Sequence, residues 1–448
     1  MPLDSAALTF PADTSAVHVG DVDGDGRDEL ITVATPTVKG QPDRVTLTVL
    51  HFGADGAPGS RSTLDLGSRP LLWEADHGLW GLDREGLVRL DPAGGAAVRI
   101  ARFPTLLAGL GPTTPVQADI ARDLDDDGKP ELIAWSAGRY LVYRTDGAAW
   151  GSIPAPARGS VRARYALGGQ AITAASEPPP LVFGDVDGDR KVDLLLPSHD
   201  TVQVYFTGAT IGARAGTVRL PLDLEPEPPP PGSAAARREL SGIWLEDLDG
   251  DRKVDLGVSR YVHDGSWFSA TVEWLYARGT GSGFEALKTT SFSQAAFNLE
   301  PADVDGDGDQ DLTAILADVT IGNIARALVA RQARGDLVML PYAGGYAPKP
   351  VSLRSLTFPI EKFENFHISF DGDLDADKKL DLVCDEGAGS LRAWKGMGTA
   401  LPAAPTWDSG VPVPAGSDLL VHDFTGDGRA EILVWTAGRT AATLLRVR

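Results

Sequence analysis

Residues 183–196 read Phe-Gly-Asp-Val-Asp-Gly-Asp-Arg-Lys-Val-Asp-Leu-Leu-Leu, a short acidic loop followed by an apolar run. Three aspartates stand at alternate positions, and a fourth follows after three further residues. The apolar segments on either side, 181–183 and 194–196, are typical of short β-strands. The stretch therefore predicts two strands joined by a loop in which four crowded carboxylates need a neutralising cation.

The same pattern, with acids at positions 1, 3, 5 and 9, occurs seven times, and the segments are called loop 1 to loop 7 in chain order. These positions are Asp21, Asp23, Asp25 and Glu29; Asp123, Asp125, Asp127 and Glu131; Asp185, Asp187, Asp189 and Asp193; Asp247, Asp249, Asp251 and Asp255; Asp303, Asp305, Asp307 and Asp311; Asp373, Asp375, Asp377 and Asp381; and Asp423, Thr425, Asp427 and Glu431. Ca²⁺ accepts six to eight oxygen ligands in flexible geometry, whereas Mg²⁺ demands an octahedron. Zn²⁺ is not expected, because no Cys or His stands at ligand spacing. The loops therefore predict about seven Ca²⁺ ions bound by these side chains.

The spacing of the loops indicates a repeat architecture. They begin at residues 21, 123, 185, 247, 303, 373 and 423, so most units have room for four short strands. The first interval is nearly twice as long as the others, and its second half, 68–103, holds four short apolar runs without an acidic loop. Four-stranded units of this length, arranged radially, are the blades of a β-propeller.

We therefore predict an all-β protein, a single β-propeller over residues 1–448 with eight blades, or seven if 68–103 is not a blade. The predicted blades are 14–67, the degenerate 68–103, 115–175, 181–224, 238–292, 296–350, 364–412, and 417–448 completed by 1–12. The last unit supplies only three strands, and Ala6 to Phe10 provides a fourth. Pairing of these two segments would close the ring and remove an open sheet edge.

Composition excludes several classes of protein. The net charge of −21 argues against nucleic acid as a partner, because phosphate contacts need clustered Lys and Arg. No apolar run reaches about 18 residues, so we expect no membrane span. Met1 to Phe10 has neither a basic start nor an apolar stretch and is not expected to be a signal peptide. The single cysteine, Cys384, excludes an internal disulfide.

The loops resemble those of FG-GAP or VCBS repeats, the units of the integrin α-chain propeller and of many bacterial surface proteins. Phe183 and Gly184 before loop 3 resemble the FG element, whereas the GAP element is absent after the loops. The resemblance implies that each metal loop joins the first and second strands of its blade, on one face of the disc. It also implies a surface or secreted binding or adhesion module, with a protein or glycan partner on the opposite face. Because extracellular modules bind Ca²⁺ at about 10⁻⁴ to 10⁻³ M, we expect an extracellular, cell-surface or periplasmic location.

Residues 260–276 hold the candidate partner-binding site. Arg260, Tyr261 and His263 belong to a basic loop, and Trp267 falls on the polar side of the strand that follows. An aromatic ring in such a place can stack on a sugar or a peptide. The alternative is that Trp267 packs against the neighbouring blade. Arg334 to Asp336 spells the peptide that integrins recognise, but we expect a plain hairpin turn there.

The sequence favours a binding protein over an enzyme. Its seven histidines are scattered, and no nucleophile elbow, His-Glu-x-x-His motif or P-loop is present. The alternative is a calcium-dependent lyase or hydrolase that acts on an acidic polysaccharide, with Ca²⁺ holding a uronate and Arg, Lys or Tyr acting as the base. Such an enzyme needs an open metal position beside a cationic side chain in a cleft.

Overall fold

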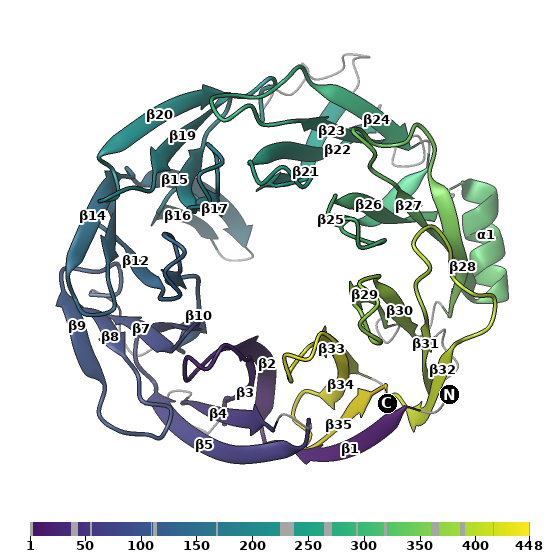
Figure 1. The fold of residues 1–448 in the computed structure, drawn as a ribbon, viewed down its shortest axis with the longest axis horizontal. Coiled ribbons are helices and arrows are strands. Elements are labelled where there is room, and N and C mark those ends of the chain that lie inside the picture. The colour runs from purple at the N-terminus through teal and green to yellow at the C-terminus, as the bar shows by residue number, and fades with distance from the viewer. Residues whose placement is uncertain are drawn as a thin grey trace.

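Eight β-sheets form a closed ring in the computed structural model (Figure 1). The structure describes residues 3–36, 44–53, 56–108, 110, 114–166, 169–224, 237–263, 271–292, 294–317, 320–359, 367–385, 390–414 and 416–447. Each of the eight sheets contains four antiparallel strands that are hydrogen-bonded neighbours. The prediction of an all-β propeller with eight blades is therefore confirmed, and the seven-bladed alternative is excluded.

The strands of each blade follow one another from the inner side of the ring to the outer side (Figure 1). Blades 1 to 4 contain β2 (Thr14–Gly20), β3 (Glu29–Ala34), β4 (Val45–Phe52) and β5 (Pro58–Gly67); β6 (Leu72–Ala75), β7 (Leu79–Asp83), β8 (Gly86–Arg89) and β9 (Val98–Arg102); β11 (Ala121–Arg122), β12 (Glu131–Ser136), β13 (Arg139–Tyr143) and β14 (Ala149–Pro154); and β17 (Val182–Gly184), β18 (Asp193–Pro197), β19 (Thr201–Phe206) and β20 (Arg214–Arg219). Blades 5 to 8 contain β21 (Arg237–Glu246), β22 (Asp255–His263), β23 (Thr271–Ala277) and β24 (Lys288–Phe292); β25 (Ala295–Ala302), β26 (Asp311–Ala317), β27 (Gln332–Leu340) and β28 (Val351–Pro359); β29 (Ile368–Gly372), β30 (Asp381–Cys384), β31 (Ser390–Trp394) and β32 (Trp407–Pro412); and β33 (Ser417–His422), β34 (Glu431–Thr436), β35 (Ala441–Arg446) and β1 (Asp4–Thr9).

The N-terminal strand closes the ring, as predicted. β1 pairs antiparallel with β35, with Asp4 opposite Arg446 and Thr9 opposite Ala441. The Phe10 N–H donates to the Thr440 carbonyl at 2.6 Å and extends the pairing. The Phe10 ring is buried in the cluster between blades 8 and 1. Closure satisfies backbone groups that an open edge strand would expose.

The apolar run after each acidic loop forms the second strand of a blade and is buried on both faces. In β3 all six residues are buried. Leu30 packs with Leu433 of blade 8, whereas the next residue, Ile31, packs with Trp73 of blade 2. Because alternate side chains face two different neighbouring blades, the run is continuously apolar instead of alternating with polar residues.

Residues 68–103 form blade 2, in which each predicted apolar run lies in one of the strands β6 to β9. The connection between β6 and β7 is a short turn at 76–78, without the acidic pattern. A fifth strand, β10 (Val116–Gln117), pairs parallel with β6 on the inner side of the blade. This differs from the predicted boundary, which assigned residues from 115 onward to blade 3. The short strand is held by backbone pairing that no local pattern indicates.

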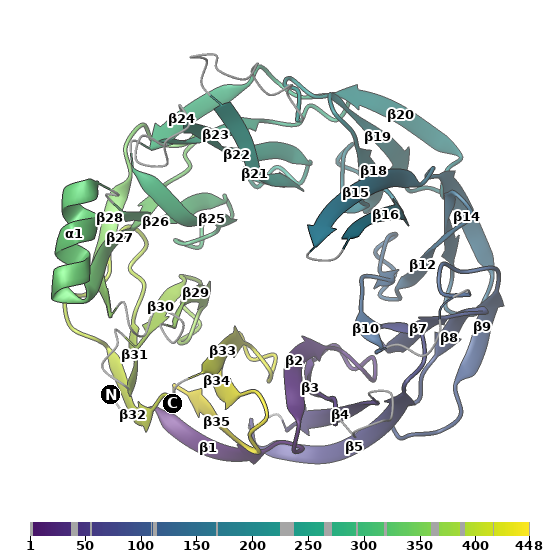
Figure 2. The same ribbon diagram turned by 180° about the vertical axis from the view of Figure 1, so that it is seen from behind.

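Two additions lie outside the blades. β15 (Arg158–Ala166) and β16 (Gly169–Glu177) form a separate hairpin between blades 3 and 4, on the face seen in Figure 2. The helix α1 (Ile321–Ala330) joins β26 to β27 on the outer side of the ring (Figure 1). The predicted turn at Arg334 to Asp336 is wrong: these residues lie within β27, where Arg334 pairs with Thr357. The helix provides the connection, so the strand begins before this tripeptide.

Candidate metal centres

Each acidic loop connects the first strand of its blade to the second. Loop 1 joins β2 to β3, loop 2 joins β11 to β12, and loops 3 to 7 lead into β18, β22, β26, β30 and β34. Because all seven use the same connection, they lie on one face, toward the inner side of the ring (Figure 1). The fold brings their acids together: one carboxylate oxygen from each of Asp123, Asp125 and Asp127, for example, lies within 4.8 Å of the other two.

The aspartate at position 1 shapes the backbone of its loop. One of its carboxylate oxygens accepts a hydrogen bond from the backbone N–H of position 6 in all seven loops, at 2.5 to 3.1 Å; the donors are Gly26, Gly128, Arg190, Arg252, Gly308, Lys378 and Gly428. Position 6 has a positive φ in every loop, from 68° to 96°, which explains why glycine is frequent there. This side chain therefore holds the loop in a tight curl around the other acids.

The acid at position 9 is deeply buried, with an exposed fraction between 0 and 4%. In six loops one of its oxygens accepts the N–H of position 2, at 2.7 to 3.0 Å; the donors are Val22, Leu124, Val186, Leu248, Leu374 and Phe424. Burial, opposed by such backbone N–H groups, raises the pKa of Glu131, Asp255, Asp311, Asp381 and Glu431 to about 7 and that of Asp193 to about 6. A cation in the loop would lower these pKa values, because it favours the charged form.

The aspartate at position 3 keeps a buried oxygen without a hydrogen bond. In loops 2, 3, 5 and 6, and among the described residues, no donor reaches the Oδ1 atoms of Asp125, Asp187, Asp305 and Asp375. A buried polar atom without a partner costs about 1–3 kcal/mol, and more for a charged group. A hard divalent cation would satisfy these oxygens, since Ca²⁺ prefers carboxylate and carbonyl ligands. The residues present therefore fit such an ion.

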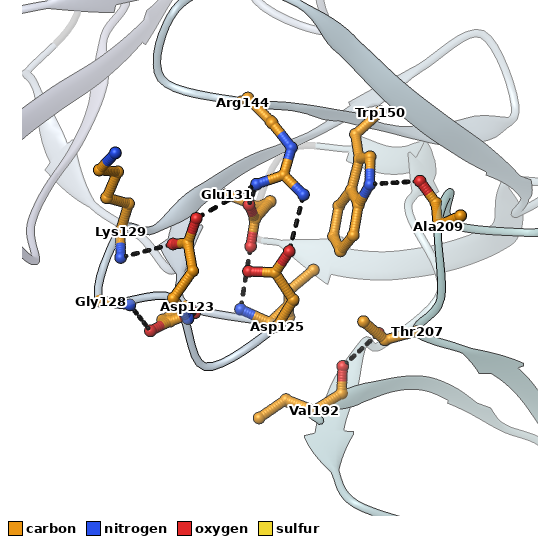
Figure 3. Close-up of polar contacts among 12 residues, drawn as sticks. Asp123, Asp125, Gly128, Lys129, Glu131, Arg144, Trp150, Val192, Thr207 and Ala209 are labelled. Atoms are coloured by element: carbon orange, nitrogen blue, oxygen red, sulfur yellow. Dashed lines mark hydrogen bonds and ion pairs between the residues drawn. The ribbon is translucent and has the colours of Figure 1, made fainter. Parts of the chain in front are cut away.

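Loop 2 also receives a basic side chain from the third strand (Figure 3). Arg144 directly follows β13, and its Nη2 lies 2.7 Å from Asp125 Oδ2. Its Nη1 lies 3.0 Å from Glu131 Oε1. The guanidinium stacks on Trp150, 4.6 Å from the ring centroid, and the Trp150 indole N–H donates to the Ala209 carbonyl at 2.9 Å. The Asp127 Oδ2 lies 3.6 Å from Arg144 Nη1, so Arg144 is fixed among three acids of one loop.

Four further loops receive a basic side chain in a similar way. The pairs are His51 with Glu29 in loop 1, Arg214 with Asp187 in loop 3, Arg278 with Asp249 in loop 4, and Lys395 with Asp377 in loop 6. The sequence prediction missed all of these residues. Their one common signal is a basic residue near the end of the third strand or the start of the fourth, and this signal has no fixed spacing from the loop.

Backbone hydrogen bonds join loops 3 to 7 each to the preceding loop, and we call this series the loop belt. The N–H of position 8 donates to a carbonyl of the previous loop, from Val192 to Leu124 (2.9 Å), Val254 to Asp185 (2.8 Å), Gln310 to Leu248 (2.9 Å), Leu380 to Val304 (3.1 Å) and Ala430 to Asp373 (2.7 Å). Where the ring closes, His422 Nε2 lies 2.7 Å from Asp28 Oδ2 of loop 1. The acidic loops therefore contribute to the contacts between blades.

The basic loop expected at Arg260, Tyr261 and His263 is wrong: these residues pair within β22, at its end on the face opposite the acidic loops. The Arg260 Nε lies 2.7 Å from Glu273, and the Tyr261 hydroxyl donates to the Ala296 carbonyl at 3.3 Å. His263 is 5% exposed. Trp267 lies outside the described residues. The three described side chains thus have partners within the protein.

Among the residues that the structure describes, no helix is both long and apolar enough to span a membrane.

Three solved structures illustrate what the fold is similar to. Sqt1 of Saccharomyces cerevisiae is 12% identical, with a TM-score of 0.34 and coverage of 100% of both chains. The NanB sialidase of Streptococcus pneumoniae is 8% identical, with a TM-score of 0.27 and coverage of 84% of this chain and 66% of that chain. The Tc holotoxin pore of Photorhabdus luminescens is 12% identical, with a TM-score of 0.27; the match covers 98% of this chain and spans only 27% of the toxin chain. Likenesses this distant carry no argument about function, and no protein-family model or curated protein matches the chain.

Proposed function

We propose that the chain is a calcium-binding β-propeller of the FG-GAP or VCBS kind, and that its seven loops hold structural ions. The observation that carries this proposal is the buried, unpartnered oxygen at position 3 of loops 2, 3, 5 and 6. Positions 1, 3, 5 and 9 would provide the ligands. Ca²⁺ would neutralise their mutual repulsion, while the backbone curl held by position 1 keeps them together without the ion.

The charge of the whole chain supports the proposal. The formal net charge is −21, and seven Ca²⁺ ions would bring it to about −7. The latter value is ordinary for a soluble protein, whereas a large uncompensated charge destabilises the compact state through self-repulsion. Bound cations would therefore stabilise the ring both locally and through the total charge.

We further propose that the ring serves as a surface or secreted binding module for a protein or glycan partner. Loops on a rigid scaffold are frequent binding sites. The face opposite the acidic loops carries the connections between blades, including the β15–β16 hairpin. An exported location would provide the millimolar Ca²⁺ that such modules need.

Two cavities lie away from the acidic loops. One of about 450 Å³ lies between blades 1 and 2, and another of about 370 Å³ is lined by residues of β25, β29 and β33 and by His367. Neither is lined by a position of the seven acidic loops. The basic residues that do reach the loops, such as Arg144, are bound to the carboxylates instead of facing a cleft. A calcium-dependent lyase or hydrolase is therefore the less favoured candidate.

Counting ions tests the proposal. Native mass spectrometry of the chain in Ca²⁺ should show up to about seven bound ions, which EGTA removes and equimolar Mg²⁺ does not replace. At free Ca²⁺ ten times Kd, each ion contributes about 1.4 kcal/mol of stability. The melting temperature should therefore fall strongly on chelation at matched ionic strength. No retained Ca²⁺ together with an unchanged melting temperature would contradict the proposal.

A further inference from the structure

Loop 5 differs from the other six loops at position 7. That position is basic in the others, as Arg27, Lys129, Lys191, Lys253, Lys379 and Arg429. In loop 5 it is Asp309. The segment from Asp303 to Asp311 therefore holds five acids and no basic residue.

Loop 5 also lacks the basic side chain that other loops receive from the later strands. Among the described residues, no ion pair reaches any carboxylate between Asp303 and Asp311, whereas loops 1, 2, 3, 4 and 6 each have such a pair. Loop 6 approaches with its backbone, since a side chain added at Gly306 would meet the Lys378 carbonyl. On the other side, Asp309 comes close to Gly250 of loop 4. Among the described residues, the acids of loop 5 thus have no basic side chain as a partner.

Two oxygens of loop 5 are buried and unpartnered. One is Asp305 Oδ1 and the other is Asp311 Oδ2. Asp311 is 2% exposed, and its Oδ1 accepts the Tyr342 N–H at 2.8 Å. In the other six loops the oxygen corresponding to Asp311 Oδ2 accepts the N–H of position 2. In loop 5 the Val304 N–H lies near the Asp311 carboxylate but forms no close hydrogen bond with Oδ2, so this oxygen is held less tightly than its counterparts.

Loop 2 is the opposite case. Arg144 pairs with Asp125 and Glu131 and is held in place by Trp150 (Figure 3). Lys129 adds a second positive charge at position 7. A Ca²⁺ ion entering loop 2 has to displace or tolerate the guanidinium, whereas an ion entering loop 5 meets only oxygen atoms.

We propose that loop 5 is the tightest calcium site of the ring, that loops with a basic side chain among their acids, such as loop 2, bind Ca²⁺ more weakly, and that Asp309 and Arg144 contribute to this order. The inference rests on the proposed function, because it ranks sites that must first bind Ca²⁺. Its physical basis is the charge count of the loop, which tunes the affinity of calcium sites over several orders of magnitude. The ions should therefore bind in sequence and not as one equivalent set.

Calorimetric titration with Ca²⁺, combined with native mass spectrometry, tests the order on the full chain. Asp309→Lys gives loop 5 the residue type of its six counterparts and should weaken the first-bound ion at least tenfold without changing the ion count. Asp309→Asn should give an intermediate loss and guards against a folding defect. Lys191→Asp is the reciprocal control, since it should tighten loop 3. Arg144→Gln should tighten the ion of loop 2.

Asp305→Asn identifies the loop directly, because it should remove the first-bound ion while leaving the weaker ones. If Asp305→Asn or Asp309→Lys leaves the first dissociation constant unchanged, the order is overturned although calcium binding stands. If the unmodified chain binds no Ca²⁺ at all, the proposed function itself fails. The two failures are therefore distinguishable in one set of titrations.

Discussion

Blade 2 and the seven loop-bearing blades make the same connection between first and second strands with different chemistry. In blade 2 the turn is held without a cation site: the Trp80 indole N–H donates to the Asp76 carbonyl at 2.9 Å, and His77 Nδ1 lies 2.7 Å from Asp76 Oδ1. The Gly78 N–H donates to the Asp21 carbonyl of loop 1 at 2.9 Å. Gly78 has a φ of 140°, and an added side chain would meet the Trp80 ring. Blade 2 thus contacts loop 1 without an acidic loop of its own.

The contact between blades 2 and 3 is also made without an acidic loop in blade 2. Glu74 of β6 accepts the backbone N–H groups of Ile120 and Ala121, the latter at 2.6 Å, which joins blade 2 to blade 3. Elsewhere the loop belt makes the contacts between neighbouring blades. The comparison teaches that a four-stranded blade needs no acidic loop to turn the chain. The loops instead add backbone hydrogen bonds between blades, which the proposed Ca²⁺ ions would stabilise, whereas blade 2 uses a carboxylate and an extra strand.

The two kinds of connection should differ most in how an Asp→Ala substitution changes stability with and without Ca²⁺. In Ca²⁺ at ten times Kd, Asp187→Ala should remove one ion and lower the free energy of unfolding by about 1.4 kcal/mol. In EGTA the same change should not destabilise, because it removes a buried, unpartnered oxygen, and the Arg214 pair that is lost is largely exposed. Asp76→Ala in blade 2 is the control. Denaturant melts should show a calcium-dependent loss of stability for Asp187→Ala and the same loss with and without Ca²⁺ for Asp76→Ala. If the loss for Asp187→Ala is also the same in both conditions, the loops and the blade 2 turn do not differ in this respect.

The pH dependence of stability is the second largest expected difference between the acidic loops and blade 2. Burial raises the pKa of Glu131, Asp255 and Asp381 to about 7, so between about pH 4.5 and pH 7 the folded chain binds more protons than the unfolded chain. Without Ca²⁺, stability should therefore be greatest below the unfolded pKa and fall as the pH rises toward 7. Saturating Ca²⁺ should abolish this fall for the loops.

A smaller decrease in stability with rising pH should remain in Ca²⁺, because burial also raises the pKa of Glu74, in blade 2, to about 7. Glu74→Gln should remove that remainder. Thermal melts from pH 5 to pH 8 check both expectations. If stability in EGTA increases with pH, or if Ca²⁺ leaves its pH dependence unchanged, the loop acids do not behave as buried, metal-free carboxylates.

The parts of the fold that the sequence predicted are those with local patterns. The acidic loops, the buried runs such as Leu194 to Leu196, the degenerate blade and the closing strand all have a periodicity or a spacing that is visible in one unit. β10 and α1 were not predicted. β10 has only two residues and pairs with β6 across more than forty residues of chain, so its existence depends on long-range packing.

The geometry of the acidic loops was predicted in outline, but the basic side chains that surround them were not. The position-1 hydrogen bonds follow the repeated spacing, and so the loop geometry is common to all seven. Arg144 and Lys395 reach their loops from the third strand, at distances along the chain that differ from blade to blade. The turn assigned to Arg334 to Asp336 failed because a helix, not a hairpin, precedes β27.

Amide hydrogen exchange with and without EGTA tests most directly whether the acidic loops are cation-dependent contacts between blades. Chelation should speed exchange at position 6 of the seven loops and at position 8 of loops 3 to 7, because those N–H groups hold the curl and the loop belt. Peptides covering β6 to β9 of blade 2 should change little, since their contacts use Glu74 and Gly78 instead. Unchanged exchange in the loops, or an equal increase in blade 2, would contradict the account.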